Sequence, residues 1–361
     1  MIYIVTFLLS VVIANCLQKR RYSSWWYVLA IVPLVFLAAY RSVDVGRDTH
    51  YTYDWFRLCL SSVTMRRPLE DAGKSELFVA IQFYISRYTH DFNLSLIPIY
   101  IITYGSILFS FIRIKKYGLI AVGLIVYLLF FHRESLNILR QVMAIGLCMI
   151  SFTYLIESKY IKSLIPLPFA YGFHHSAYIF LIIILLKLFT DKYKRIAKKN
   201  WMKIFIFILG AVTVMAFQTI ALYMGGLGVI EDEYIEGSLN DDLFESKLPI
   251  SGLAMNSVNL LIFLYLPHHY KLIIKNKPFF LYILIIAFLC SFLGLVSIFT
   301  TRIGGYFWGM APIIMMMLFD KKNRTSFFFK GYIAFTFFYW FMTVVVAKLG
   351  DIYPYKSVLF D

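Results

Sequence analysis

The chain has 361 residues, of which 60% are hydrophobic, 19% aromatic and 15% charged, and its formal net charge is +15 at pH 7. A soluble globular protein carries about 25% charged residues, and several apolar runs here exceed the roughly 18 residues that cross a bilayer. The composition excludes an ordinary soluble protein and predicts an all-α polytopic membrane protein.

The first predicted helix covers residues 1–17 and has no basic residue ahead of it, whereas the basic run "QKRR" follows it. A secretory signal peptide carries its positive charge before the apolar segment. We therefore expect a retained helix whose start lies outside.

Apolar segments predict about twelve membrane crossings in a single domain over residues 1–361. Their approximate bounds are 1–17, 24–40, 94–112, 118–131, 138–156, 163–173, 176–189, 202–224, 251–267, 278–299, 303–319 and 326–347. Lys and Arg collect in cytoplasmic loops, and the basic connectors fall in every second loop. These loops carry 22 Lys and Arg against 3 Asp and Glu, whereas the rest of the chain carries 13 against 17. The pattern predicts that both termini lie outside, and it explains the net charge without a nucleic-acid partner.

Residues 162–190 could form one long helix or two short ones that meet at "YGFHHSAY". A single crossing would place the basic loop Lys187–Lys203 outside, against the distribution of the other charges. We therefore expect a hairpin with its tip at Phe173–Ser176. Its arms are shorter than the bilayer core is thick, so the tip should lie partly below the outer surface.

Two of the external loops are long. The first covers residues 41–93 and should contain an amphipathic helix around Glu76–Arg87. The second covers residues 225–250 and is acidic, which is typical of a solvated surface.

Unusual polar residues gather on the predicted outer face, where ionisable groups at membrane depth are costly and usually line a functional cavity. Arg133, Asn137 and Arg140/Gln141 recur at helical spacing, which predicts one shared helix face. Arg302 and Tyr306 are also four residues apart, with Thr300 or Thr301 as the expected N-cap. The outer set comprises Arg41, Arg47, Asp48, Glu76, Arg133, Glu134, Asn137, Arg140, Gln141, His174, His175, Arg302 and Tyr306.

Simpler roles remain open for several of these residues. Interfacial arginines and tyrosines often only anchor the ends of helices. Asp48 could be a helix cap in front of Tyr51, Tyr53 and Phe56, with Gly46 allowing the turn. The two adjacent histidines could be polar packing at a turn.

The sequence predicts no metal site and no cofactor, because the paired histidines lack an HxxxH or HExxH pattern. Arginine side chains bind phosphate oxygens with two parallel hydrogen bonds and stay charged when partly buried. A nearby carboxylate could accept a proton from a sugar hydroxyl. Without a metal, the charge on a diphosphate leaving group must be met by cations of the protein.

At these residues the chain resembles the EpsG-type family of bacterial polysaccharide polymerases, relatives of the Wzy O-antigen polymerases. The resemblance covers nearly the whole chain and rests on short motifs. These are "YRSVDVGRDTHYTYDWF", Glu76 in "KSELFVAIQFYIS", "LNILRQVMAIGL", "FHHSAYIF" and "TRIGGYF".

The resemblance implies an enzyme of the bacterial inner membrane whose active site faces the periplasm. Its substrates would be two undecaprenyl-diphosphate-linked glycans, a growing chain as donor and a single repeat unit as acceptor. The acceptor hydroxyl would displace undecaprenyl diphosphate from the donor. Whether a polysaccharide chain-length regulator is also a partner is left open.

We assign hypothetical roles on that basis. Diphosphate recognition falls to Arg41, Arg47, Arg140 and Arg302, and the first choice of general base is Asp48, with Glu134 and Glu76 as rivals. His174 and His175 would position a glycan or phosphate, and hydrogen-bonding support would come from Asn137, Gln141 and Tyr306, with Arg133 among the substrate-binding residues. A flippase for the same lipid-linked units, a membrane O-acyltransferase and a structural scaffold are the alternatives.

Overall fold

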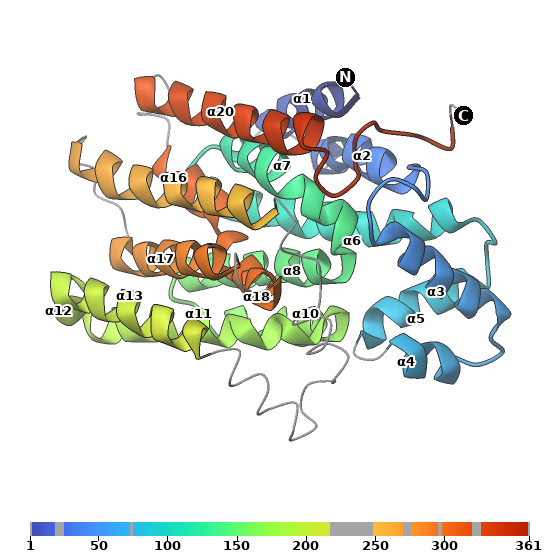
Figure 1. Cartoon of the computed structure of the whole chain (residues 1–361), viewed down its shortest axis with the longest axis horizontal. Helices are drawn as coiled ribbons and strands as arrows, with labels where there is room; N and C mark the ends of the chain where they lie inside the picture. The colour runs from blue at the N-terminus through green and yellow to red at the C-terminus, as the bar shows by residue number, and fades with distance from the viewer. Residues whose placement is uncertain are drawn as a thin grey trace. The chain divides into compact units, whose positions relative to one another are not determined.

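The computed structural model describes residues 2–18, 25–72, 75–216, 248–269, 276–294, 298–319 and 326–359. The regular elements in these ranges are all helices, and an isolated bridge pairs Arg41 with Ser357. Figure 1 colours the chain by residue number. The chain forms two compact units: unit 1 comprises Met1–Tyr178 with Pro312–Asp361, and unit 2 comprises Ile179–Ala311. The prediction of an all-α chain is confirmed for the described ranges.

Unit 1 contains six long helices and several short ones. The long helices are α1 (Ile2–Cys16), α2 (Trp25–Ala39), α6 (Phe92–Arg113), α7 (Ile120–Asn137), α8 (Leu139–Ile156) and α20 (Phe327–Trp340), which continues as a π-helix over Phe341–Val346. The short ones are α3 (Thr49–Ser61), α4 (Arg66–Ala72), α5 (Glu76–Ile85), α9 (Tyr160–Leu164) and α10 (Leu167–Phe173). A 3₁₀ helix (His175–Ile179) and α19 (Ala311–Leu318) lie at the boundaries between the units.

Unit 2 is built around α17, which packs against α11, α13, α16 and α18. Its helices are α11 (Phe180–Lys192), α12 (Lys194–Ala197), α13 (Asn200–Met215), α16 (Leu248–His269), α17 (Lys277–Leu293) and α18 (Ile298–Trp308). Most of the predicted acidic loop 225–250 lies outside the described residues, which resume at Leu248.

Four helical stretches among the described residues are long and apolar enough to cross a membrane. They are Phe92–Arg113, Ile120–Asn137, Leu139–Ile156 and Phe327–Val346. Shorter apolar helices, such as Ile2–Cys16, Trp25–Ala39 and Lys277–Phe292, accompany them. The chain therefore fits a helical membrane protein, while the number of crossings and the side on which the termini lie stay predictions.

The six long helices of unit 1 run between two distinct ends of that unit. At one end, Tyr3 donates to the Ile352 carbonyl at 2.7 Å, and the Asn93 side-chain amide donates to the Ala39 carbonyl at 2.7 Å. At the other end, the Gln18 amide donates to the Lys115 carbonyl at 2.9 Å. The polar loop after α2 thus lies at the first of these ends, and the basic connection between α6 and α7 lies at the second.

The structure corrects the helix boundaries around "RESLNILRQ". Helix α7 extends to Asn137, the chain breaks at Ile138 (φ −95°, ψ 56°), and α8 begins at Leu139. The expectation that Arg133, Asn137 and Arg140 share one helix face is therefore wrong. Arg140 instead lies in the first turn of α8.

Within the predicted loop 41–93, three short helices pack against one another at the right of Figure 1. The amphipathic helix expected around Glu76–Arg87 is found as α5 and buries Phe78, Val79 and Gln82. Helix α3 begins directly after Asp48, as expected, but the Asp48 side chain makes no capping hydrogen bond.

The chain changes conformation where the sequence predicted a hairpin tip. Helix α10 ends at Phe173, His174 is extended (φ −157°, ψ 118°), and the 3₁₀ helix follows at once. The first arm is itself divided, because α9 ends before Pro166 and α10 begins after it. The depth of the tip in the membrane stays a prediction.

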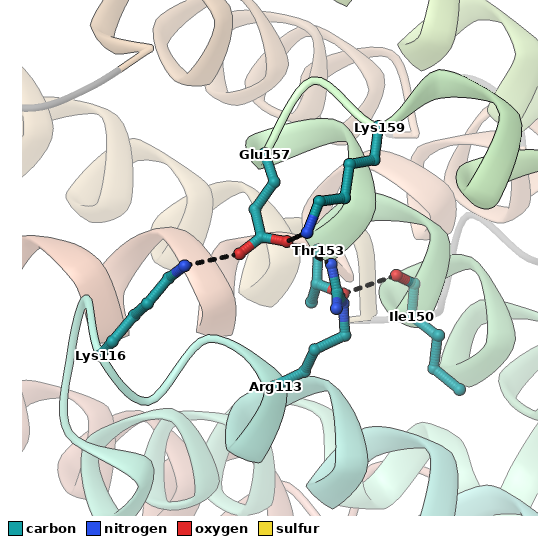
Figure 2. Close-up of polar contacts among 6 residues, drawn as sticks. All are labelled: Arg113, Lys116, Ile150, Thr153, Glu157 and Lys159. Atoms are coloured by element: carbon teal, nitrogen blue, oxygen red, sulfur yellow. Dashed lines mark hydrogen bonds and ion pairs between the residues drawn. The ribbon is translucent and has the colours of Figure 1, made fainter.

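A cluster of ions closes the basic end of unit 1, centred on Glu157 directly after α8 (Figure 2). The Glu157 carboxylate accepts from Arg113 at 2.6 Å, from Lys116 at 2.8 Å and from Lys159 at 2.8 Å. Burial alone would raise the pKa of Glu157, but Lys116, Lys159 and Arg113 outweigh it and lower the pKa from 4.5 to about 2. The carboxylate therefore joins α6 to α8 in its charged form.

This depressed pKa predicts an acid-dependent loss of stability. The contribution of Glu157 should be fully present above pH 4.5 and should be lost as the pH falls through about 2. Its size should be on the order of 2 kcal/mol, since solvent screens the two lysines. At neutral pH the purified protein should therefore have a higher unfolding temperature than Glu157→Gln. This difference in unfolding temperature should shrink in acid. Parallel pH profiles for the two proteins would contradict the assignment.

Candidate functional site

Arg41 is a buried anchor of unit 1, with a relative exposure of 1%. Its guanidinium donates to Thr49 Oγ1 at 3.0 and 3.2 Å, to the Ala38 carbonyl at 2.9 Å and to the Leu136 carbonyl at 3.2 Å. It also donates to the Tyr100 hydroxyl. Since five N–H groups are the full capacity of an arginine, Arg41 fixes the loop after α2 to α6 and α7 and offers no donor to a ligand in this arrangement.

Arg47 lies six residues after Arg41 in the same loop. It is half exposed and is paired with the C-terminal segment, residues 348–359. Its Nε donates to Asp351 Oδ2 at 2.8 Å. The backbone N–H of Gly46 donates to the Asp351 carbonyl at 3.0 Å. Gly46 has φ +91°, and a Cβ there would lie 2.8 Å from the Leu136 carbonyl oxygen, so this loop requires glycine.

The C-terminal segment continues along the same loop. Ser42 N–H donates to the Lys356 carbonyl at 3.0 Å, and Val358 N–H donates to the Tyr40 carbonyl at 3.2 Å. Gly350 (φ +78°) approaches α7 so closely that a Cβ would lie 2.5 Å from Asn137 Nδ2. The first polar motif of the chain and its last residues therefore form one structure.

The end of α7 supplies three of the predicted residues. Asn137 accepts from the Arg47 backbone N–H at 2.8 Å and donates to the Arg133 carbonyl at 3.0 Å. Arg133 is buried, and its Nε donates to Glu134 Oε1 at 3.0 Å. Asn137 thus positions the Arg47 backbone, while Glu134 is engaged by its neighbour in sequence.

Arg140, at the start of α8, links α8 to two of the short helices. Its Nη1 donates to Ser75 Oγ at 3.0 Å, and its guanidinium lies 4.2 Å from the centre of the Trp55 ring. Ser75 is the N-cap residue of α5, and Trp55 belongs to α3. At this distance the Trp55 ring attracts the cationic guanidinium and helps to hold it in place.

Glu76 follows Ser75 and faces the segment after α10. Both of its carboxylate oxygens lie 3.1 Å from His175 Nε2. The His175 ring stacks on Tyr171, with centroids 4.2 Å apart and planes at 9°. His174 instead contacts Ser176 Oγ through Nδ1 at 2.6 Å. The two histidines thus have different partners, and His175 is the one that joins α5 to α10.

These contacts form a continuous row at one end of unit 1. From the C-terminal segment the row passes through Asp351, Arg47 and Asn137, and beyond the break at Ile138 it continues through Arg140, Ser75, Glu76 and His175. Asp48 is partly exposed next to Arg47, and Gln141 is buried next to Arg140. The row contains two guanidinium groups and two carboxylates, so it can bind an anion and accept a proton within the same region.

Arg302 and Tyr306 belong to unit 2, so their approach to this row stays a prediction. Both lie in α18, where Tyr306 is fully buried and Arg302 is partly exposed. Helix α18 begins at Ile298, which places Thr300 and Thr301 inside the helix. The expectation that either threonine is an N-cap is therefore wrong.

No group of three His, Cys, Asp or Glu side chains that could hold a metal ion occurs within the part of the chain that the structure describes. The polar groups of the row are instead arginines, single carboxylates and one histidine. A phosphate ligand of this region would therefore be bound by guanidinium groups.

Four residues that belong to the row or contact it were not among the sequence predictions. Ser75 and Trp55 hold Arg140, Tyr171 stacks on His175, and Asp351 pairs with Arg47. Asp351 had a detectable signal, because "LGDIYPYK" is a polar stretch with glycine and proline after the last apolar run. Trp55 stands within the quoted motif "YTYDWF" and could have been chosen as a partner for an arginine.

Comparison with known proteins gives one family match. A model described as the EpsG family matches residues 24–357. No curated protein and no solved structure matches the chain. The matched range begins before α2 and ends within the C-terminal segment, so it includes every residue of the row.

Proposed function

This chain belongs to the EpsG family, and from that premise we propose that it is a membrane glycosyltransferase that joins undecaprenyl-diphosphate-linked repeat units into a surface polysaccharide. Family membership supports a role like that of a polysaccharide polymerase. The observation that carries the proposal further is the row from Asp351 to His175, which brings four of the quoted motifs together at one end of unit 1.

The reaction is a displacement at the anomeric carbon of the donor glycan. A hydroxyl oxygen of the acceptor forms the new bond to that carbon, and the bond from the carbon to the diphosphate oxygen breaks. The diphosphate leaves with the electron pair of that bond, and the hydroxyl proton passes to a carboxylate of the protein. The donor chain is thereby transferred onto the acceptor, which keeps its own lipid carrier.

Arg47 and Arg140 are the residues we assign to the diphosphate, with Arg302 as a third from unit 2. Each guanidinium near a phosphate oxygen contributes on the order of 4 kcal/mol at about 4 Å and an effective dielectric constant of about 20. Arg41 takes a different role from the one expected, because its donors are already bound within the protein. We propose that it positions the loop carrying Arg47.

Asp48 remains the first choice for the general base in the proposal, because it is partly exposed and directly follows Arg47 at the start of α3. Glu134 accepts from Arg133, and Glu76 contacts His175. His175 and the exposed Tyr171 ring form a flat surface beside Glu76, which suits a sugar ring of the acceptor. Gln141 and Tyr306 stay hydrogen-bonding support in the proposal, and His174 positions the glycan.

The proposal is tested with the purified full-length protein in bilayers and a defined undecaprenyl-diphosphate-linked repeat unit. A ladder of longer glycans, with release of undecaprenyl diphosphate and no effect of a chelator, is the expected result. Movement of the unit across the bilayer without longer products would identify a flippase. Acyl transfer to the glycan without chain extension would identify an acyltransferase.

The ion pair between Arg47 and Asp351 yields a specific prediction. In Asp351→Asn the backbone should be retained, because asparagine tolerates the φ of +52° found here. Loss of the carboxylate charge frees the Arg47 side chain, so KM for the lipid-linked substrate should rise about two- to fivefold with little change in kcat.

The matched control for this change is Glu70→Gln. It breaks the exposed pair between Arg66 and Glu70, whose Nε to Oε1 distance is also 2.8 Å. That variant should keep the wild-type KM. An unchanged KM in Asp351→Asn would show that the C-terminal segment does not position Arg47 for substrate.

A further inference from the structure

A groove on unit 2 combines an apolar floor with a basic rim, and neither belongs to the row in unit 1. The groove lies between α11 and α13 and has a volume of ≈ 280 Å³. Its lining comes entirely from apolar side chains, including Ile182, Leu185, Phe189, Met202, Phe205 and Ile206. Among the described residues, no charged or hydrogen-bonding side chain lines it.

The floor of the groove is exposed although its side chains are large and apolar. Leu185 is 63% exposed, Ile182 is 47% exposed and Phe205 is 49% exposed. In a membrane protein such a surface faces acyl chains. From Ile182 to Phe189 the groove follows about two helical turns, or roughly 10 Å.

The rim is formed by the short connection from α11 through α12 to α13, drawn at the left of Figure 1. The segment from Lys187 to Lys203 carries seven basic residues and a single acidic one. The exposed ones are Lys192, Lys194, Arg195, Lys198 and Lys199. The acidic residue, Asp191, accepts from the buried Lys187, so it is engaged within α11.

Rim and floor are contiguous. Met202 lines the groove, and its backbone N–H donates to the Lys199 carbonyl at 3.2 Å. Phe189 lines the groove one turn before Lys192. Tyr193 and Trp201 are both exposed and lie among the basic residues of this connection. Exposed tyrosine and tryptophan are typical of a membrane interface.

We propose that this groove binds an anionic diacyl phospholipid, with its acyl chains along α11 and α13 and its phosphate at α12. Positive charge next to an apolar channel matches a lipid that is apolar at one end and negative at the other. A zwitterionic lipid fills the apolar part but gains little from the basic residues. The groove shares no residue with the proposed catalytic row, and lipid binding there does not depend on the proposed reaction.

The test uses the full-length protein in nanodiscs of phosphatidylcholine with and without phosphatidylglycerol. Native mass spectrometry after release from the nanodisc measures how much of each lipid stays bound. The wild type should retain phosphatidylglycerol preferentially. The double variant Lys194→Gln/Lys198→Gln should reduce that preference about tenfold or more.

Two matched controls separate a built site from a general effect of charge or size. Lys162→Gln/Lys330→Gln removes two exposed lysines from unit 1 and should leave the preference intact. Leu185→Trp fills the groove and should reduce retention of the lipid. Leu188→Trp changes an exposed leucine that does not line the groove, so retention should stay at the wild-type level.

Equal retention of the two lipids by the wild type would overturn the proposal. So would equal losses in the two lysine pairs, which would reveal only a general attraction to anionic membranes. Because lipid retention is measured without any reaction, failure here leaves the proposed polymerase function untouched. Loss of polymerisation, conversely, would not affect the lipid measurement.

Discussion

Replacing Arg140 with lysine should reduce the rate of polymerisation by about two orders of magnitude. Lysine keeps the charge but loses the planar group that stacks 4.2 Å from the Trp55 ring centre and donates to Ser75. It also loses the two parallel donors that fit a phosphate. The measurement is the initial rate of chain extension from a defined lipid-linked repeat unit.

Arg66→Lys is the matched control for this variant. Arg66 belongs to α4, one of the same three short helices, and pairs with Glu70 at an exposed position. Its replacement should leave the rate within about a factor of two, as expected for an exposed pair. A wild-type rate of chain extension in Arg140→Lys would show that Arg140 does not act in the site, whatever the control shows.

Replacing Arg41 with methionine should lower the free energy of unfolding by about 3–5 kcal/mol. Methionine is similar in length, yet it leaves the Tyr100 hydroxyl and the Leu136 carbonyl buried without their donor. The change should appear as a large drop in the unfolding temperature of the purified protein, accompanied by loss of polymerisation.

The combination of the two readouts distinguishes a positioning residue from one that binds substrate. Arg140→Lys should lose activity while it keeps the wild-type unfolding temperature, whereas Arg41→Met should lose both. If Arg41→Met keeps the wild-type unfolding temperature but does not polymerise, Arg41 would bind the diphosphate, as the sequence predicted. Arg66→Met is the control for Arg41→Met, because it makes the same change in side-chain size and charge at an exposed position.

Most of the long helices could be predicted from the sequence, because apolar runs are detectable without knowledge of their partners. The break at Ile138 could not, since "SLNILRQ" contains neither glycine nor proline and its helical spacing continues across the break. The polar contacts of Asn137 with the Arg47 backbone lie at this break, and they depend on a segment ninety residues earlier.

The candidate site was predicted in its residue types but not in its contacts. Arginine, carboxylate and histidine stand out in an apolar sequence, so Arg47, Arg140 and Glu76 were identified at once. Burial decides their roles, and no pattern in "YRSVDVGRD" distinguishes the enclosed Arg41 from the half-exposed Arg47. Asp351 was missed because its partner lies 304 residues away.

That separation along the chain also sets the order in which the molecule can mature during synthesis. The loop from Tyr40 to Arg47 leaves the ribosome long before its partners Asp351, Lys356 and Ser357 have been made. Until those residues have been added, the early loop lacks the segment that closes it. A chain terminated before Asp351 therefore cannot form the contacts that hold Arg47 in place.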